Sequence, residues 1–262
     1  MPATLRPAAR FAALSRRGSI IVMAVASVGL ILAVFGLPLL LAPLPEPIGS
    51  AAEAFGRGAR MTLRLTALAG GLGLILGLGL GLAKISSSAA VRAVAGFYIW
   101  VIRGTPLVVQ LLFIYFVLPT LFPLLRASDV LSAVLALGIN VAAYNAEILR
   151  AALQAIPRGQ SEAAYALGFR RGQSLRIVLL PQAIRMAVPP LVNNMIGLLK
   201  DSSLAYVIGV VELSLIGNRL QAETFRPVPA FVTVAGVYLM MTTFMNIFSH
   251  ALERYLSPDR RR

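Results

Sequence analysis

Residues 157 to 182 read Pro-Arg-Gly-Gln-Ser-Glu-Ala-Ala-Tyr-Ala-Leu-Gly-Phe-Arg-Arg-Gly-Gln-Ser-Leu-Arg-Ile-Val-Leu-Leu-Pro-Gln, between two apolar stretches. The run from Ser161 to Leu167 consists of good helix formers, and Gly168 is well placed to end that helix. A second short helix is predicted over about 172–179, ending ahead of Pro181. We therefore expect two short basic helices joined at a glycine.

The composition around this stretch is that of a membrane protein. Of the 262 residues, 58% are hydrophobic and 13% are charged, whereas a soluble domain is about 45–50% apolar and about 25% charged. A net charge of +14 would favour nucleic-acid binding in a polar chain. In a chain this apolar, basic loops on the inner side of a membrane explain the charge better, so no nucleic-acid partner is expected.

The residue inventory argues against chemistry in this chain. There are no cysteines and one histidine, His250, which excludes disulfides, thiolate metal sites, cysteine nucleophiles and a multi-histidine metal site. Asp and Glu total ten and lie mostly in predicted loops. We therefore expect no catalytic residues and no metal site.

Six apolar stretches are long enough to cross a bilayer, which takes about 20 residues. The first is too long for a secretory signal, whose apolar part is about 7–15 residues. The third contains Arg103 and the fourth contains Glu147, while Lys200 and Asp201 interrupt the fifth. The expected spans are 19–42, 59–83, 93–118, 130–152, 186–211 (broken at 200–201) and 227–252. The predicted fold is an all-α integral membrane protein.

The distribution of basic residues sets the orientation. If the N-terminus is cytoplasmic, the larger part of the 24 Lys and Arg residues falls in inner segments, as membrane topology favours. Both termini, including Arg6, Arg10 and the final run 260–262, are then cytoplasmic, and so is the loop 153–182.

Small residues recur in the second span. Its glycines have neither a preceding strand nor a following Gly-Lys-Ser/Thr, so a nucleotide-binding loop is not indicated. Ala69, Gly73, Gly77 and Gly81 are spaced by four, which places them on one helix face where a second helix can approach closely.

The loop resembles the Glu-Ala-Ala loop of binding-protein-dependent ABC importer permeases. The matching residues are Glu162, Ala163, Ala164, Gly168, Leu180 and Pro181. Val178 stands where isoleucine is usual. Further segments are similar to the polar amino acid branch of that family, over roughly 55–253: Arg103–Leu111, Ala143–Arg150, Leu199–Leu204 and Thr224–Pro227.

The resemblance implies a five-helix permease core over 55–253. Residues 1–54 are then a cytoplasmic N-terminus with one added helix and an external loop, and 254–262 a basic cytoplasmic tail. It also implies a place in the bacterial cytoplasmic membrane and three kinds of protein partner: an amino-acid-binding protein, a second permease subunit and cytoplasmic ATP-binding subunits that dock on the six loop residues. No cofactor is expected in this chain, since ATP belongs to the partner.

Polar groups within the spans are the candidates for the substrate path, because an amino acid must exchange its water for them. These candidates are Glu147, Asn193, Asn194, Asp201 and Ser202. Arg103 and Glu147 are expected at similar depths, about 16 Å and about 15 Å from the inner face at 1.5 Å per residue, and hence as a pair. A secondary transporter or channel, which should show inverted repeats, and a membrane scaffold remain alternatives.

Overall fold

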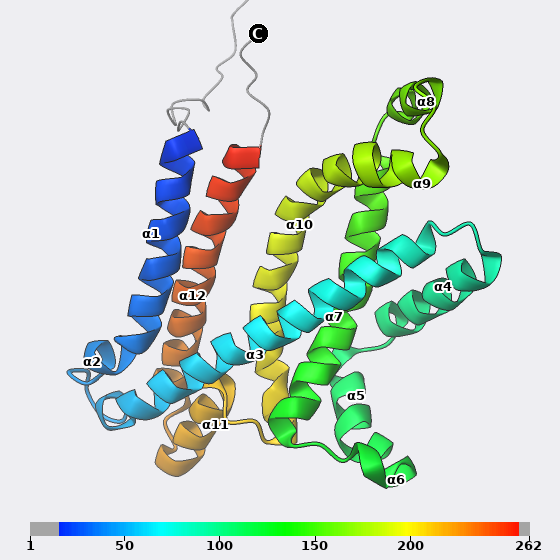
Figure 1. The fold of residues 1–262 in the computed structure, drawn as a ribbon. Coiled ribbons are helices and arrows are strands. Elements are labelled where there is room, and N and C mark those ends of the chain that lie inside the picture. Colours follow the sequence, from blue (N-terminus) through cyan, green and yellow to red (C-terminus); the bar gives the residue numbers. More distant parts are fainter. Residues whose placement is uncertain (1–15, 257–262) are drawn as a thin grey trace, which may run out of the picture.

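The computed structural model describes residues 16–256, and in this part of the chain all regular secondary structure is helical (Figure 1). The α-helices are α1 (Arg16–Phe35), α2 (Leu37–Leu41), α3 (Ile48–Lys84), α4 (Ala89–Gly104), α5 (Leu107–Leu112), α6 (Leu118–Leu121), α7 (Asp129–Gln154), α8 (Arg158–Ala166), α9 (Arg171–Gln173), α10 (Leu180–Asp201), α11 (Leu213–Thr224) and α12 (Pro227–Leu256). Tighter or wider helical turns join some of them: η1 (Phe113–Val117), η2 (Pro123–Leu125), η3 (Ser174–Leu179) and η4 (Ser202–Ile208). Arg6, Arg10 and the run 260–262 lie outside the described residues.

Five helical segments are long and apolar enough to cross a membrane, and a bent pair of helices is a sixth candidate. The five are α1, α3, α7, α12 and the continuous segment Arg171–Ile208. This confirms the all-α membrane fold. Figure 1 shows α8 and α9 at the same end of the molecule as the start of α1 and the end of α12, with α2, α6 and α11 at the opposite end.

Helix α3 crosses the molecule obliquely (Figure 1). Its 37 residues correspond to about 55 Å at 1.5 Å per residue, well above the bilayer core of about 30 Å. The expected boundary between residues 54 and 55 falls inside this helix, so α3 continues without a break from the N-terminal part into the expected core.

The third expected span, 93–118, is not one straight helix. The chain bends by 107° between α4 and the segment Leu107–Leu121. Pro106 has no N–H to continue the helix, and the residue before a proline is driven towards extended backbone. Thr105 accordingly has φ −118° and ψ 145°. The third expected span is therefore present as a bent pair of helices, and the bend itself was not predicted.

The fifth span shows the reverse error. The helical segment Arg171–Ile208 is continuous, and the expected break at Lys200 and Asp201 is only a change from α-helix to the 3₁₀ turn η4. The expected end of a short helix ahead of Pro181 was also wrong. The wider π turn η3 precedes Pro181, which enters the first turn of α10, where its missing N–H costs little.

The small-residue face of α3 packs closely against another helix, as predicted, and the structure identifies that helix as α7. A Cβ on Gly77 would lie 2.5 Å from Asn145 Cβ, and one on Gly81 would lie 2.9 Å from Leu149 Cδ2. Gly73 meets Val141 in the same way. These three partners are spaced by four residues on α7, so the two helices touch along a matched pair of stripes.

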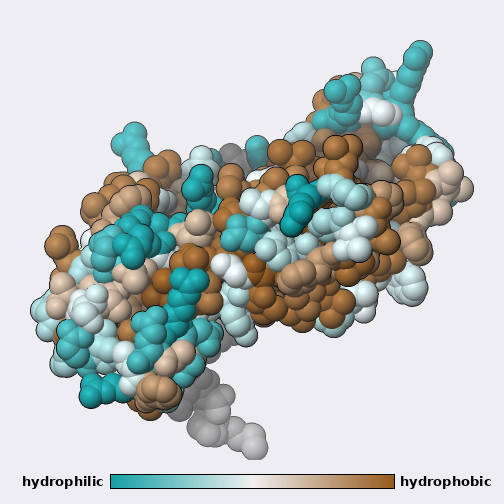
Figure 2. Space-filling model, turned by 90° about the horizontal axis from the view of Figure 1, so that it is seen from below, coloured by the Kyte–Doolittle hydropathy of each residue, from teal (hydrophilic) through white to brown (hydrophobic). Residues whose placement is uncertain are grey.

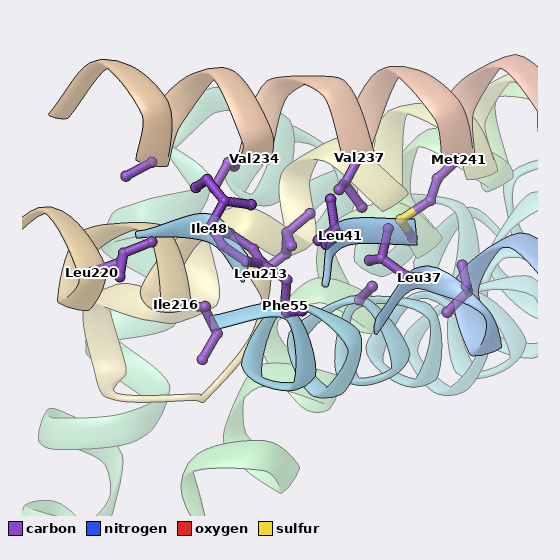
Figure 3. Packing of buried hydrophobic residues seen from close by; sticks show 14 of the residues in the cluster. Leu37, Leu41, Ile48, Phe55, Leu213, Ile216, Leu220, Val234, Val237 and Met241 are labelled. Atoms are coloured by element: carbon purple, nitrogen blue, oxygen red, sulfur yellow. The ribbon is translucent and has the colours of Figure 1, made fainter. Parts of the chain in front are cut away.

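A second core joins α2, α3, α11 and α12 (Figure 3). Its side chains include Leu37 and Leu41 from α2, Phe55 from α3, Leu213 from α11 and Met241 from α12. Phe55, Leu213 and Met241 are fully buried. This core fixes the end of the molecule opposite α8. Figure 2 views that end from below and shows hydrophilic residues gathered towards the left, where α2, α11 and the start of α3 lie in Figure 1.

Glu212 lies within this end of the molecule and is fully buried. Its carboxylate caps α11 by accepting hydrogen bonds from the backbone N–H groups of Ser214 and Leu215, both at 2.9 Å. It also accepts from the Tyr238 hydroxyl of α12 at 2.9 Å and the Thr62 hydroxyl of α3 at 3.5 Å. Burial raises the pKa of this carboxyl despite these bonds. One side chain thus ties together three helices.

Candidate functional site

The bend between α4 and α5 is held by one buried glutamine. Gln110 donates to the Ile102 carbonyl at 2.8 Å and to the Thr105 hydroxyl at 2.8 Å, which satisfies an otherwise open carbonyl at the end of α4. Its own side-chain oxygen accepts from Asn140 of α7 at 3.0 Å. The Arg-Gly-Thr-Pro segment is therefore a hinge anchored to α7.

A polar cavity lies beside this hinge. It has a volume of about 390 Å³, and we call it the Asp201 cavity. Residues from the bend between α4 and α5 and from α5, α7, α10 and η4 form its walls. They are Thr105, Pro106, Leu107, Asn140, Val141, Tyr144, Asn194, Leu198, Asp201 and Leu204. Of the five expected substrate-path residues, Asn194 and Asp201 line this cavity.

A second cavity, of about 470 Å³, lies between α3, α4 and α7, and we call it the Glu147 cavity. Its lining combines charged and aromatic side chains with small ones. They are Lys84, Gly96, Ile99, Trp100, Arg103, Gly104, Tyr144 and Glu147. Glu147, also expected on the substrate path, is therefore in a different cavity from Asp201.

Arg103 is not the ion-pair partner of Glu147. Glu147 pairs with Arg150 one turn along the same helix, with Nε to Oε1 at 2.8 Å. Side chains three residues apart on a helix are neighbours whatever the fold, so Arg150 is always within reach. The guanidinium of Arg103 instead lies 5.2 Å from the centre of the Tyr144 ring. The expected pair is corrected, although both residues line the same cavity.

The other two expected path residues lie elsewhere. Asn193 accepts a hydrogen bond from Ser249 of α12 at 3.1 Å, so it faces the α10–α12 contact. Ser202 is buried and donates to the Leu199 carbonyl at 2.8 Å. Neither lines the two cavities. Asn194 in turn donates to Asn145 of α7 at 2.8 Å and thereby connects the Asp201 cavity to the α7–α10 contact.

The loop between α7 and α10 contains the short helix α8, as predicted. Gly168 has φ +84°, and the N–H of Phe169 reaches back to the Ala164 carbonyl at 3.0 Å. This is the left-handed helix end that favours glycine. Glu162 and Ala163 are exposed, whereas Ala164 is buried. Ala164 therefore packs against its own chain, and Glu162 and Ala163 form the exposed part of this motif.

The loop is tied to the membrane helices at its other end. Leu180 packs against a buried cluster that includes Leu149 and Ile156 of the α7 end, while Pro181 is exposed. Gln182 of α10 also donates to Gln160 of α8 at 3.2 Å. These contacts join α8 to α10, and the start of α10 to the end of α7.

Sequence reasoning missed three residues that shape the cavities: Gln110, Asn140 and Tyr144. Two of them lie inside segments already noted for their resemblance to amino acid permeases. The available signal was a polar residue in an apolar span, the criterion that selected Glu147. It was applied to Glu147, to the amides of Asn193 and Asn194 and to Ser202, but not to these three side chains.

Comparison with known proteins places the chain among membrane transport subunits. Residues 73–262 match the family model described as the inner membrane component of binding-protein-dependent transport systems. The glutamine transport system permease protein GlnP of Escherichia coli (strain K12) is 43% identical over 197 residues, covering 75% of this chain and 90% of that protein. The arginine transport system permease protein ArtQ of Bacillus subtilis (strain 168) is 38% identical, covering 77% of this chain and 92% of that protein.

Solved structures agree. An amino acid ABC transporter with histidines has a chain that is 40% identical, with a TM-score of 0.74, covering 78% of this chain and 95% of that one. A methionine ABC transporter, MetNI, in an inward-facing conformation has the same fold at 21% identity, with a TM-score of 0.68. The chain belongs to the family of binding-protein-dependent transport system inner membrane components, the permease subunits of ABC importers.

Proposed function

We propose that this chain is the membrane subunit through which an ATP-driven importer moves polar amino acids. The observation that carries the proposal is the Asp201 cavity, where amide and carboxylate groups from α7 and α10 face the anchored hinge. Such groups can replace the water of a zwitterion, which apolar helices alone cannot do. Relatives named for glutamine, arginine and cystine transport support an amino acid as the cargo.

The energy is proposed to come from partner subunits that bind ATP and dock on α8. The exposed Glu162 and Ala163 and the turn at Gly168 are the surface offered to them, and Leu180 and Pro181 lead from it into α10. A binding protein delivers substrate at the opposite end, and a second permease subunit completes the path. The protein lies in the bacterial cytoplasmic membrane, with α8 and both termini inside.

The proposed organisation keeps three parts: residues 1–54, the permease core 55–253 and the tail 254–262. The match to the family model begins at residue 73, after α1 and α2. Helix α1 packs along α12, where Gly29 lies so close that a Cβ would be 2.6 Å from the Phe244 ring. In the proposed organisation, the added helix α1 contacts the core along its last span, α12.

The test is uptake by proteoliposomes that contain this chain with its matching ATP-binding subunit and binding protein. Labelled glutamine, arginine and cystine are offered with and without internal ATP. Accumulation that requires both ATP and binding protein is expected. Uptake without ATP would indicate a secondary transporter or channel, and assembly without uptake of any amino acid would indicate a scaffold.

A further inference from the structure

The two cavities meet at one aromatic side chain. Tyr144 lines both the Asp201 cavity and the Glu147 cavity. Opposite it, the backbone passes from one cavity to the other in one step, because Gly104 lines the Glu147 cavity and Thr105 lines the Asp201 cavity. On α7, Asn140 precedes Tyr144 and lines the Asp201 cavity, while Glu147 follows Tyr144 and lines the other cavity.

Arg103 covers this junction. Its guanidinium carbon lies 5.2 Å from the centre of the Tyr144 ring, within the distance of about 6 Å at which a ring attracts a cation. Within residues 16–256, Arg103 makes no ion pair, and the nearby Glu147 is taken by Arg150. The ring is therefore the direct contact of the guanidinium, and Glu147 of the same cavity also attracts it without forming an ion pair.

Both side chains are accessible from outside this single chain. Tyr144 is 39% exposed and Arg103 is also exposed. An arginine within a span is not left facing lipid hydrocarbon but faces water or protein. The side of the molecule with this contact is therefore a wet or protein-covered side, as a transport path requires.

We infer that Arg103 and Tyr144 form a gate between the two cavities of the substrate path, an inference that rests on the proposed function. The two residues stand on different elements, which are joined near this point by the Tyr98 hydroxyl of α4 donating to the Ile139 carbonyl of α7 at 2.7 Å. Arg103 is on the last turn of α4, next to the hinge at Thr105, and Tyr144 is on α7, which ends just before α8. A movement of α8 carried along α7 withdraws the ring from the guanidinium.

The contact is also one that a substrate can replace. A carboxylate offers a guanidinium two charge-assisted hydrogen bonds, a stronger partnership than an aromatic face. The α-carboxylate of an amino acid in the Asp201 cavity therefore competes with Tyr144 for Arg103. The gate opens toward its cargo without leaving a bare charge in the membrane.

The absence of cysteine in the sequence permits a direct test with single cysteine variants. Leu204→Cys reports on the Asp201 cavity, and Gly104→Cys reports on the Glu147 cavity, where an added Cβ meets no atom within 4 Å. A water-soluble thiol reagent is added to the purified protein in vesicles on the side to which α8 projects, identified with Arg170→Cys.

With Tyr144→Phe, which keeps the ring, we expect fast reaction at Gly104→Cys and slow reaction at Leu204→Cys. With Tyr144→Leu, the rate at Leu204→Cys should rise roughly twofold to thirtyfold, the population change that loss of one cation–π contact allows. The rate at Gly104→Cys should stay the same. Equal Leu204→Cys rates in the two Tyr144 variants would overturn the gate.

The second pair of variants is Arg103→Gln with Arg103→Lys as its matched control. If Tyr144→Leu does not yield monodisperse protein, this second pair tests the gate on its own. Arg103→Gln removes the cation and should speed Leu204→Cys as Tyr144→Leu does, whereas Arg103→Lys should not. Because thiol labelling needs no transport, the gate can fail while wild-type uptake succeeds. A wild type without ATP-dependent uptake would instead reject the proposed function.

Discussion

At the scale of single residues, Glu147 shows how a charge inside a span is neutralised. It lines a cavity with Lys84 and Arg103, yet its ion pair is with Arg150 on the same helix. Their side chains are 28% and 27% exposed, so water weakens the attraction without removing it.

A double-mutant cycle should therefore couple Glu147 to Arg150 and not to Arg103. The variants are Glu147→Gln and Arg150→Gln, separately and together, with Arg103→Gln as the matched partner. Thermal unfolding of the protein in detergent should give a coupling of about 1 kcal/mol for Glu147 with Arg150. Coupling of that size between Glu147 and Arg103 instead would contradict the pairing described above.

Glu212 makes a prediction about pH. Because burial raises the pKa of its carboxyl in the folded protein, the folded state binds this proton more tightly than the unfolded chain. The contribution of Glu212 to stability is therefore complete below the unfolded pKa of about 4.3. It is lost as the pH rises through the raised folded pKa.

Glu212→Gln should remove this pH dependence. The amide lowers the stability of the protein by an amount that does not depend on pH. Its NH2 group is a hydrogen-bond donor and would face groups that now donate to the carboxylate, such as the Ser214 backbone N–H and the Tyr238 hydroxyl. The difference in melting temperature between wild type and variant should nevertheless shrink as the pH rises from 4 towards neutrality. A difference that stays constant over that range would show that the proton on Glu212 is not linked to folding.

The wrong partner for Glu147 shows what sequence cannot supply at this scale. Counting residues from the ends of two helices gives their depth, and both Arg103 and Glu147 do reach one cavity. Depth does not say which way a side chain points around the helix axis. The end of α8 was easier to predict from the sequence, because φ +84° at Gly168 depends only on the local backbone.

At the scale of elements, α3 and α7 can approach closely because the residues of α3 that meet α7 are glycines, which have no side chain. Gly77→Ala should destabilise the protein by about 1–3 kcal/mol, since its Cβ would crowd Asn145 Cβ at 2.5 Å and the Ala142 carbonyl at 3.0 Å. Gly79→Ala on the same helix meets nothing within 4 Å and should be neutral or slightly stabilising. Thermal unfolding in detergent compares them. Equal effects would mean that α3 and α7 do not pack along this face.

The loop helix α8 gives the same kind of matched pair for function. Gly168→Ala places a side chain at φ +84° with open space around it, so only the backbone is strained, by about 1–2 kcal/mol. Gly172→Ala is equally unobstructed and lies at an ordinary helical φ. We expect Gly168→Ala to insert normally but to lose ATP-dependent uptake or substrate-stimulated ATP hydrolysis, while Gly172→Ala keeps both. Full coupling in Gly168→Ala would remove α8 as the transmitting element.

The elements also divide into those that sequence could predict and those that it could not. Apolar length located the five long spans and the bent pair, and small-residue spacing predicted a closely packed face on α3 without identifying α7 as its partner. The break was assigned to the wrong span because charge was taken as a helix breaker, and proline alone would not have decided the matter, since Pro189 and Pro190 lie inside α10 without ending it. Lys200 and Asp201 continue a helix readily, since their backbone N–H groups remain available, whereas Pro106 ends one. The π turn at η3 could not be anticipated, since it depends on how α8 and α10 pack.

At the scale of the whole molecule, the oblique course of α3 and the bend after α4 place the functional parts in sequence. Residues of α7 line both cavities, and Figure 1 shows α7 running from the end of the molecule that bears α6 to the end that bears α8. A proposed ATP-driven loop at one end is therefore linked by α7 and α10 to a polar site within the spans. This arrangement can couple ATP hydrolysis to transport only if α8 lies on the side of the membrane where ATP is available.

The last prediction is this orientation. Arg126 lies in the turn between η2 and α7, and Arg170 lies between α8 and α9, both exposed and at opposite ends of α7. Since basic residues concentrate on the α8 side, as cytoplasmic segments do, an impermeant thiol reagent added to intact cells should modify Arg126→Cys. Arg170→Cys should react only after the membrane is opened. With no other cysteine in the chain, each label reports one site. The reverse labelling pattern would show the opposite orientation, in which α8 lies outside the cell and cannot contact a cytoplasmic ATP-binding subunit.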